Sequence, residues 1–167
     1  MAGPSATRRQ TEKVAAHVLV IQSRYYDAVA AELMAGVAAE LEAAGATFDV
    51  VEVPGALEIP QALGAATTAG LIGHNAQSPR YHGAIVAGCV IRGETSHYDI
   101  VCNNANHWLM QTAIGHDIPL GNAILTVDTE AQAMARARGG RDGKGGDAGR
   151  ACLALIALKR SFARGGA

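Results

Sequence analysis

Residues 82–101 read HGAIVAGCVIRGETSHYDIV, and the sequence changes character abruptly after Ile91. Up to that point the segment is almost entirely apolar or small, which predicts a strand buried inside a sheet. Six polar or flexible residues follow, and residues 98–117 then carry apolar side chains at helical spacing. The stretch therefore predicts a buried strand, a polar turn and a helix, in that order.

The same alternation of strand and helix extends along the rest of the chain. Further strands are predicted at 14–22, 47–53 and 119–127. Further helices are predicted at 25–45, within 56–73, and at 130–138 and 150–163. Gly45 is expected to end the first helix, and Asp128 or Thr129 to cap the helix at 130–138. The glycine-rich segment 139–149 is expected to break the chain before the last helix.

Four strands that alternate with helices indicate a parallel sheet, because each crossover between parallel strands needs a helix to connect them. We therefore predict a three-layer α/β/α sandwich with a central four-stranded parallel sheet, a flavodoxin-like architecture. The length of 167 residues fits one domain. We place that domain at 14–160, between a flexible N-terminal arm at 1–13 and a C-terminal tail at 161–167.

Composition excludes several classes of protein. A formal net charge of −1 gives no electrostatic basis for binding nucleic acid. Charges or glycines interrupt every apolar run before it could span a membrane. The three cysteines are widely separated and form no CxxC pair, so neither disulfides nor a metal site are expected, and a reducing, cytoplasmic location fits best.

Three predicted strands end in segments that carry functional residue types. Arg24, Tyr25 and Tyr26 follow the first strand, 54–58 follows the second, and the turn after Ile91 follows the third. In open parallel sheets, ligands bind outside the carboxyl ends of the strands. These segments therefore predict one shared crevice. Within it, the tyrosines either stack on a planar ligand or cover the rim of the core. Glu58 is a catalytic carboxylate, a ligand acceptor or, most commonly for such a position, an ordinary acid at the start of a helix.

The turn after the third strand is suited to anion binding and proton transfer. The backbone N–H groups of Glu94 and Thr95 precede a helix and could receive a phosphate. His97 stands at the helix entrance and could act as a general acid or base, although helix capping explains it equally well. The other five of the six histidines lack comparable surroundings and are assigned structural roles.

The segment GGRDGKGG at 139–146 superficially resembles a phosphate-binding P-loop. Arg138 stands where the motif needs its first glycine, and Gly145 stands where Ser or Thr should follow the lysine, so the motif is absent. Positive charge still gathers around this segment, on Arg136, Arg138, Arg141 and Lys144. These side chains either hold a phosphate or form a solvated turn.

Four separated segments resemble successive signatures of the 6,7-dimethyl-8-ribityllumazine synthase family. They are VPGALEIP (53–60), GCVIRGETSHYD (88–99), LTVDTEAQAMARA (125–137) and GKGG (143–146). Their shared order and spacing, within a resemblance from about 14 to 158, make chance agreement improbable. The resemblance implies condensation of 5-amino-6-(D-ribitylamino)uracil with 3,4-dihydroxy-2-butanone 4-phosphate, releasing phosphate and water, in the penultimate step of riboflavin biosynthesis. It implies no metal and no organic cofactor.

The resemblance also implies roles for individual residues. His97 would be the catalytic proton-transfer residue. The ribitylaminouracil would contact Tyr25, Ala56, Leu57, Glu58, Cys89, Val90, Ile91 and Asn122. The butanone phosphate would contact Glu94, Thr95, Arg136 and Lys144. Three segments depart from the family pattern, all on the uracil side: Arg24-Tyr25-Tyr26 replaces Arg-Phe-Asn, and Leu57 and Asn122 stand where aromatic residues are usual.

The partners implied by the resemblance are small-molecule substrates, further copies of the same chain and a riboflavin synthase. The basic unit would be a homopentamer with active sites at the subunit interfaces, and larger shells are left open. An alternative is a catalytically weak relative that binds lumazine or flavin, but the presence of both His97 and Arg136 favours the enzyme. An FMN-binding flavodoxin is disfavoured because QSRYYDA, after the first strand, lacks a glycine-rich turn.

Overall fold

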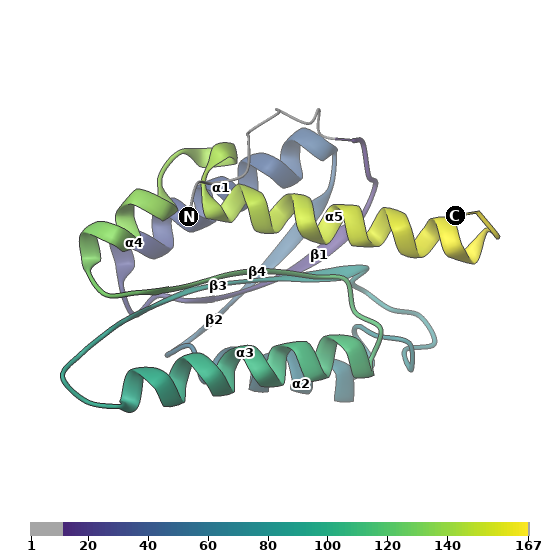
Figure 1. The fold of residues 1–167 in the computed structure, drawn as a ribbon. Coiled ribbons are helices and arrows are strands. Elements are labelled where there is room, and N and C mark those ends of the chain that lie inside the picture. The colour runs from purple at the N-terminus through teal and green to yellow at the C-terminus, as the bar shows by residue number, and fades with distance from the viewer. Residues whose placement is uncertain (1–11, 167) are drawn as a thin grey trace.

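The computed structural model describes residues 12–166, and in this range the chain forms a sheet between two layers of helices (Figure 1). The strands are β1 (His17–Ser23), β2 (Thr47–Val53), β3 (Gly83–Ile91) and β4 (Leu120–Val127), in the order β2-β1-β3-β4. Every pairing is parallel. The predicted three-layer sandwich with a four-stranded parallel sheet is confirmed. Residues 1–11 of the predicted arm lie outside the described residues.

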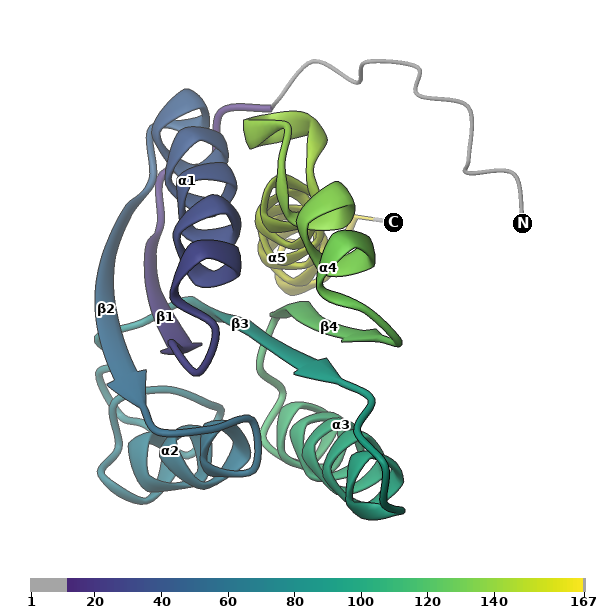
Figure 2. The same cartoon turned by 90° about the vertical axis from the view of Figure 1, so that its left-hand side faces the viewer.

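The helices divide between the two faces of the sheet (Figures 1 and 2). One face carries α1 (Asp27–Ala44), α4 (Glu130–Ala137) and α5 (Lys144–Ala163), with the short 3-10 helix η1 (Gly140–Asp142) between the last two. The other face carries α2 (Glu58–Thr68) and α3 (His97–Gly115). Among the helices of residues 12–166, none combines the length and apolarity needed to cross a membrane.

Crossover handedness explains this division. The chain steps from β1 to β2 in one direction along the sheet, and then from β2 past β1 to β3 and on to β4 in the other. Right-handed crossovers in opposite directions place their helices on opposite faces, so α1 lies on one face and α2 and α3 lie on the other. The reversal falls between β1 and β3, which are neighbours in the sheet.

Each face of the sheet has its own hydrophobic core. Along β3, Ile85 and Ala87 pack toward α1 and α5, while Ala84 and Val86 pack toward α2 and α3. Residues of α1 spaced by four positions close the first core, and each is fully buried: Val29, Leu33, Val37 and Leu41. This burial on both faces explains why β1 and β3 read as continuous apolar runs in the sequence.

Two predicted helix boundaries are confirmed. Gly45 ends α1 in the left-handed conformation, at φ 77°, and its N–H donates to the carbonyl of Glu42. At the start of α4, the cap is Thr129 rather than Asp128, because the Thr129 hydroxyl accepts from the N–H of Gln132 at 3.2 Å. The final helix continues through residues 161–163 of the predicted tail.

We predicted that the glycine-rich segment 139–149 interrupts the helices, and this was wrong for residues 144–149, which are helical. The last helix begins at Lys144, not at residue 150, and its first two turns contain Gly145, Gly146 and Gly149. A Cβ on Gly145 would overlap the carbonyl oxygen of Leu33 in α1, and a Cβ on Gly149 would crowd the side chain of Glu40. These glycines therefore let two helices approach closely, and that packing outweighs their low helix propensity.

We predict that Gly145→Ala lowers the free energy of unfolding by about 1–3 kcal/mol, because the added methyl group has no room against α1. The matched control is Gly64→Ala in α2, where nothing lies within 4 Å of the added Cβ. That variant should be neutral or more stable by up to about 1 kcal/mol. Thermal unfolding of the two purified variants measures the difference. Equal midpoints would contradict close packing of α1 and α5.

Candidate functional site

The parallel sheet brings the three predicted loop segments to a single edge. Tyr25 follows β1, residues 54–57 join β2 to α2, and residues 92–96 join β3 to α3. Because all strands run in the same direction, their carboxyl ends share this edge. The edge includes the position between β1 and β3 where the order of the strands along the sheet reverses. Sheets of this type bind ligands at that position.

His97 is the first residue of α3, and its side chain is exposed. Its backbone N–H lies 3.4 Å from the hydroxyl oxygen of Thr95, which helps to order the turn. Glu94 and Thr95 are also exposed. The turn therefore presents an accessible imidazole beside a helix N-terminus, an arrangement suited to proton transfer near a bound anion.

Arg92 holds this turn in place, a role that the sequence reasoning missed. Its backbone N–H donates to the carbonyl of Val127 at 2.9 Å, and its guanidinium donates to Asp128 at 3.1 Å and to Asp99 at 3.4 Å. The guanidinium also lies 4.0 Å from the centre of the Tyr98 ring. The short separation of Arg92 and Asp99 in the sequence could have indicated their contact. The contact with Asp128 could not be read from the sequence, because it depends on the pairing of β3 with β4.

The residues predicted for the uracil side differ in accessibility. The ring of Tyr25 makes a T-shaped contact with the ring of Tyr26, with ring centres 5.1 Å apart, and Tyr25 is 73% exposed, so a planar ligand can reach its ring. Ala56 is buried with Val101 under α3, so a ligand there would meet its backbone. Leu57 and Glu58 are partly buried at the start of α2.

The three residues predicted on β3 do not share a face. Cys89 and Ile91 pack toward the α1 layer, near Tyr26, whereas Val90 packs toward α3 with Ala56. Side chains alternate along a strand, so a single ligand could meet Val90 through its side chain and the other two only through the backbone. Burial raises the pKa of the Cys89 thiol to about 11, which keeps this thiol protonated near neutral pH.

Asn122 lies away from the shared edge. It pairs with Val86 in the middle of the sheet, and its side-chain NH₂ donates to Asn106 of α3 at 2.7 Å. Its side-chain oxygen accepts from the N–H of Ile124 at 2.8 Å. The Asn122 side chain lies on the α3 side of the outer strand β4 and is exposed, so a molecule outside this chain can reach it.

The two predicted phosphate-binding cations lie on the face of the sheet opposite to α3. Arg136 is exposed on α4 and donates to the carbonyl of Gln132 at 3.0 Å. Lys144 begins α5 and forms an ion pair with Asp147 at 2.9 Å. Figure 1 shows α4 and α5 above the sheet and α3, which begins with His97, below it. Within one chain, the sheet therefore separates these cations from His97.

Of the predicted site residues, two hollows in the described part of the chain include only Leu57. A groove of about 420 Å³ between α2 and α3 is lined by Leu57, Pro60, Gln61, Asn104, Trp108 and Thr112. A cavity of about 230 Å³ lies near the amino ends of the strands, beside Tyr81 and Lys159. Neither hollow includes His97 or Arg136. Among residues 12–166, no group of three or more His, Cys, Asp or Glu could hold a metal ion.

Comparison with known proteins gives consistent matches over nearly the whole chain. The family model for 6,7-dimethyl-8-ribityllumazine synthase matches residues 15–160. A protein of that name from Azorhizobium caulinodans is 52% identical over 145 residues, which is 87% of each chain. Another from Methylocella silvestris is 50% identical over 156 residues, or 93% of each chain. A third, from Rhodopseudomonas palustris, is 44% identical over 167 residues, covering 99% of this chain and all of the relative.

The raised pKa of Cys89 gives a prediction about its reactivity. With a pKa of about 11, roughly one thiol in a thousand is ionised at pH 8, so alkylation by iodoacetamide should be slow. The same residue in the urea-unfolded chain should react at least about tenfold faster, because the thiol is then exposed and its pKa is ordinary. Mass spectrometry of the labelled peptide measures both rates. Equal rates in the folded and unfolded chain would contradict a buried, protonated thiol.

Proposed function

The chain belongs to the 6,7-dimethyl-8-ribityllumazine synthase family, and we propose that each of its active sites is completed by a neighbouring copy of the same chain. As a member of this family it is a transferase of riboflavin biosynthesis. It condenses 5-amino-6-(D-ribitylamino)uracil with 3,4-dihydroxy-2-butanone 4-phosphate to 6,7-dimethyl-8-ribityllumazine, and releases phosphate and water.

The proposed roles follow from the chemistry of this reaction. The amine at the pyrimidine 5-position attacks the butanone carbonyl itself, so the protein has to orient the two substrates and move protons. His97 carries those protons during imine formation and the later steps. Tyr25 stacks on the pyrimidine, and residues 56–58 contact its ribityl chain. The reaction needs no thiolate, which agrees with the raised pKa of Cys89.

The phosphate group is assigned to the N–H groups of Glu94 and Thr95 and to the cations Arg136 and Lys144. Charge-assisted contacts from a forked guanidinium and an ammonium hold the phosphate as the carbon skeleton eliminates it and the second ring closes. Both cations are exposed, and so is the turn that bears His97. A phosphate in solution can therefore reach either set of groups.

The separation of His97 from both cations is the observation that carries the shared site. In one chain the turn before α3 and the start of α5 lie on different sides of the sheet (Figure 2). A second chain can supply the missing half if its α4–α5 face docks against the strand-end loops of the first. Such a contact is heterologous, because it joins two different surfaces, and when repeated it forms a closed ring if the rotation between neighbours divides a full turn.

Exposed apolar side chains on both helical layers support such a contact. On α3, Trp108 is 55% exposed and Ile114 is 74% exposed. On α5, the exposed large apolar residues are Leu155, Leu158 and Phe162. Large apolar side chains in this number usually mark a surface that another chain covers. Two different apolar surfaces on opposite faces suit a head-to-tail ring better than a twofold dimer.

We take the ring to contain five subunits, as the resemblance to the family implies, with Tyr25, Glu58 and His97 from one subunit and Asn122, Arg136 and Lys144 from its neighbour. The outward position of Asn122 on the outer strand β4 suits a residue that serves the adjoining site. A cytoplasmic location accords with three free thiols at Cys89, Cys102 and Cys152. A riboflavin synthase, which uses the lumazine product, is the proposed protein partner.

His97→Ala is expected to slow turnover by about 10²–10⁴-fold while leaving binding of ribitylaminouracil largely intact, because the side chain transfers protons rather than anchoring substrate. Single-turnover absorbance of the lumazine product gives the rate, and titration with the uracil substrate gives its affinity. A parallel loss of affinity and rate would overturn the assignment of His97 as the proton-transfer residue.

The shared site predicts that impaired chains complement one another. Arg136→Ala alone should raise the KM for butanone phosphate, since a forked cation is lost. When His97→Ala and Arg136→Ala chains are mixed in equal amounts and co-assembled, about one interface in four carries both native residues. At butanone phosphate concentrations far below the KM of the Arg136→Ala variant, activity should then rise above that of either parent.

Different affinity tags on the two chains verify mixing, and light scattering gives the mass of the assembly. Co-assembly of wild-type chains with each variant separately provides the control for subunit exchange. Verified mixed assemblies with no recovered turnover would show that His97 and Arg136 do not meet across an interface.

A further inference from the structure

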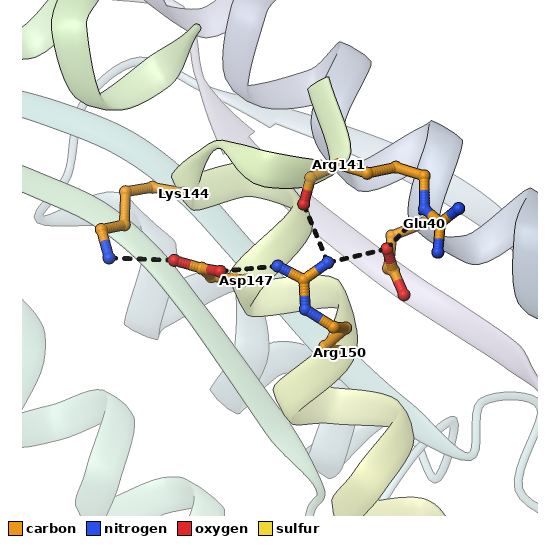
Figure 3. A network of polar contacts seen from close by, with 5 residues as sticks. All are labelled: Glu40, Arg141, Lys144, Asp147 and Arg150. Atoms are coloured by element: carbon orange, nitrogen blue, oxygen red, sulfur yellow. Dashed lines mark hydrogen bonds and ion pairs between the residues drawn. The ribbon is translucent and has the colours of Figure 1, made fainter. Parts of the chain in front are cut away.

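Lys144 stands at one end of a chain of alternating charges that begins inside the protein (Figure 3). Its ammonium lies 2.9 Å from one carboxylate oxygen of Asp147, and the other oxygen of Asp147 lies 2.6 Å from a guanidinium nitrogen of Arg150. Arg150 in turn lies 2.9 Å from Glu40, which also pairs with Arg141 at 2.9 Å. The order is therefore cation, carboxylate, cation, carboxylate, cation.

The inner end of this series of ion pairs is the buried carboxylate of Glu40. The side chain of Glu40 in α1 has no exposed surface, and a single one of its oxygens accepts from both Arg141 and Arg150. Arg150 also donates to the backbone carbonyl of Arg141 at 2.8 Å. A buried carboxylate without its cationic partners would be strongly unfavourable, so this arrangement holds Arg150 in one orientation.

Asp147 links the oriented Arg150 to Lys144 at the surface. Burial by itself would raise the pKa of Asp147, but the hydrogen bonds and charges of Lys144 and Arg150 outweigh it and lower the pKa, so the carboxylate is ionised near neutral pH. Each of its oxygens serves a different cation. The flexible Lys144 side chain, which is 53% exposed, is thereby held close to the first turn of α5. A lysine held in this way has already lost much of the rotamer entropy that anion binding would otherwise cost.

We infer that Asp147, anchored through Arg150 to the buried Glu40, is a positioning residue for Lys144 in binding the phosphate group of the butanone substrate. The inference rests on the proposed function, which assigns Lys144 to that phosphate. The phosphate becomes the next anion in the series, and it meets an ammonium that is already placed. Asp147 itself contacts no substrate.

Positioning and simple charge predict opposite effects for Asp147. If the carboxylate only neutralised Lys144, then Asp147→Asn would free a positive charge and strengthen phosphate binding. If the carboxylate positions Lys144, the same change releases a flexible side chain and weakens phosphate binding. The sign of the change in KM for butanone phosphate therefore separates the two roles.

The test uses steady-state kinetics of the assembled enzyme with each substrate varied in turn. Asp147→Asn should raise the KM for butanone phosphate by about three- to tenfold, with kcat and the KM for the uracil changed by less than about twofold. Lys144→Met should raise the same KM by about tenfold or more. In the Lys144→Met background, adding Asp147→Asn should change this KM by less than about twofold, because Asp147 acts through Lys144.

Glu42→Gln is the matched control for loss of one negative charge. Glu42 is exposed on α1, close in sequence to Glu40, but it takes no part in the ion-pair chain of Figure 3. The Glu42→Gln variant should have the same KM for each substrate as the unmodified enzyme. Asp147→Glu is a second probe that keeps the charge and moves the carboxylate by one methylene. Positioning predicts a raised KM for this variant also, whereas neutralisation predicts no change.

Several results would overturn the inference, and they point to different errors. If Lys144→Met leaves the KM for butanone phosphate unchanged, the proposed phosphate role of Lys144 fails and the inference fails with it. If Lys144→Met raises this KM but Asp147→Asn lowers it or leaves it unchanged, only the positioning role is wrong. An equal effect of Asp147→Asn with and without Lys144, or a uniform loss of kcat and of affinity for both substrates with a lowered Tm, would assign Asp147 a structural role instead.

Discussion

The handedness of the crossovers between parallel strands is the constraint on which the rest of this structure depends. Combined with the reversal of strand order between β1 and β3, it places α2 and α3 on one face of the sheet and α1 on the other. The loops that follow these two strands bear Tyr25 and His97. The helices that follow β4 return to the α1 face and carry Arg136 and Lys144 there. A fold built in this way presents the proposed proton-transfer residue and the proposed phosphate-binding cations on different surfaces. The proposed active site therefore needs the cations of a second subunit.

The contact between α1 and α5 is the second determinant of the site. Gly145 and Gly149 carry no side chain on the side of α5 that faces α1, so the two helices lie in direct contact, while Gly146 leaves room for the backbone of Arg141 in η1. That approach also brings Glu40 of α1 to Arg150 of α5, deep enough for the carboxylate to be fully buried. Close packing and the ion-pair network are thus two results of one helix contact. Both act on the first turn of α5, where Lys144 is located.

The turn that bears His97 is organised differently, by a side chain from its own strand end. Arg92 joins the end of β4, through Val127 and Asp128, to the first turn of α3, through Asp99. The β3–α3 turn is therefore tied to the sheet on one side and to the helix on the other. An exposed imidazole at the end of a fixed turn combines access to substrate with a defined position, which is what proton transfer requires.

The sequence by itself determined the order of elements, the parallel sheet and the edge at which His97 and Tyr25 lie, because these depend on local hydrophobic period and on a general rule of crossover handedness. It also carried the family signatures from 53–60 to 143–146. Only the tertiary structure decided that Lys144 begins a helix. The glycines at 145, 146 and 149 disfavour a helix locally, and the packing of Gly145 and Gly149 on α1, about a hundred residues earlier in the chain, compensates for this. The tertiary structure likewise decided that Cys89 and Val90 face different layers, and that Glu40, Arg150 and Asp147 form one series of contacts. Such contacts depend on the distance between side chains in space, and no pattern within a short stretch of sequence records that distance.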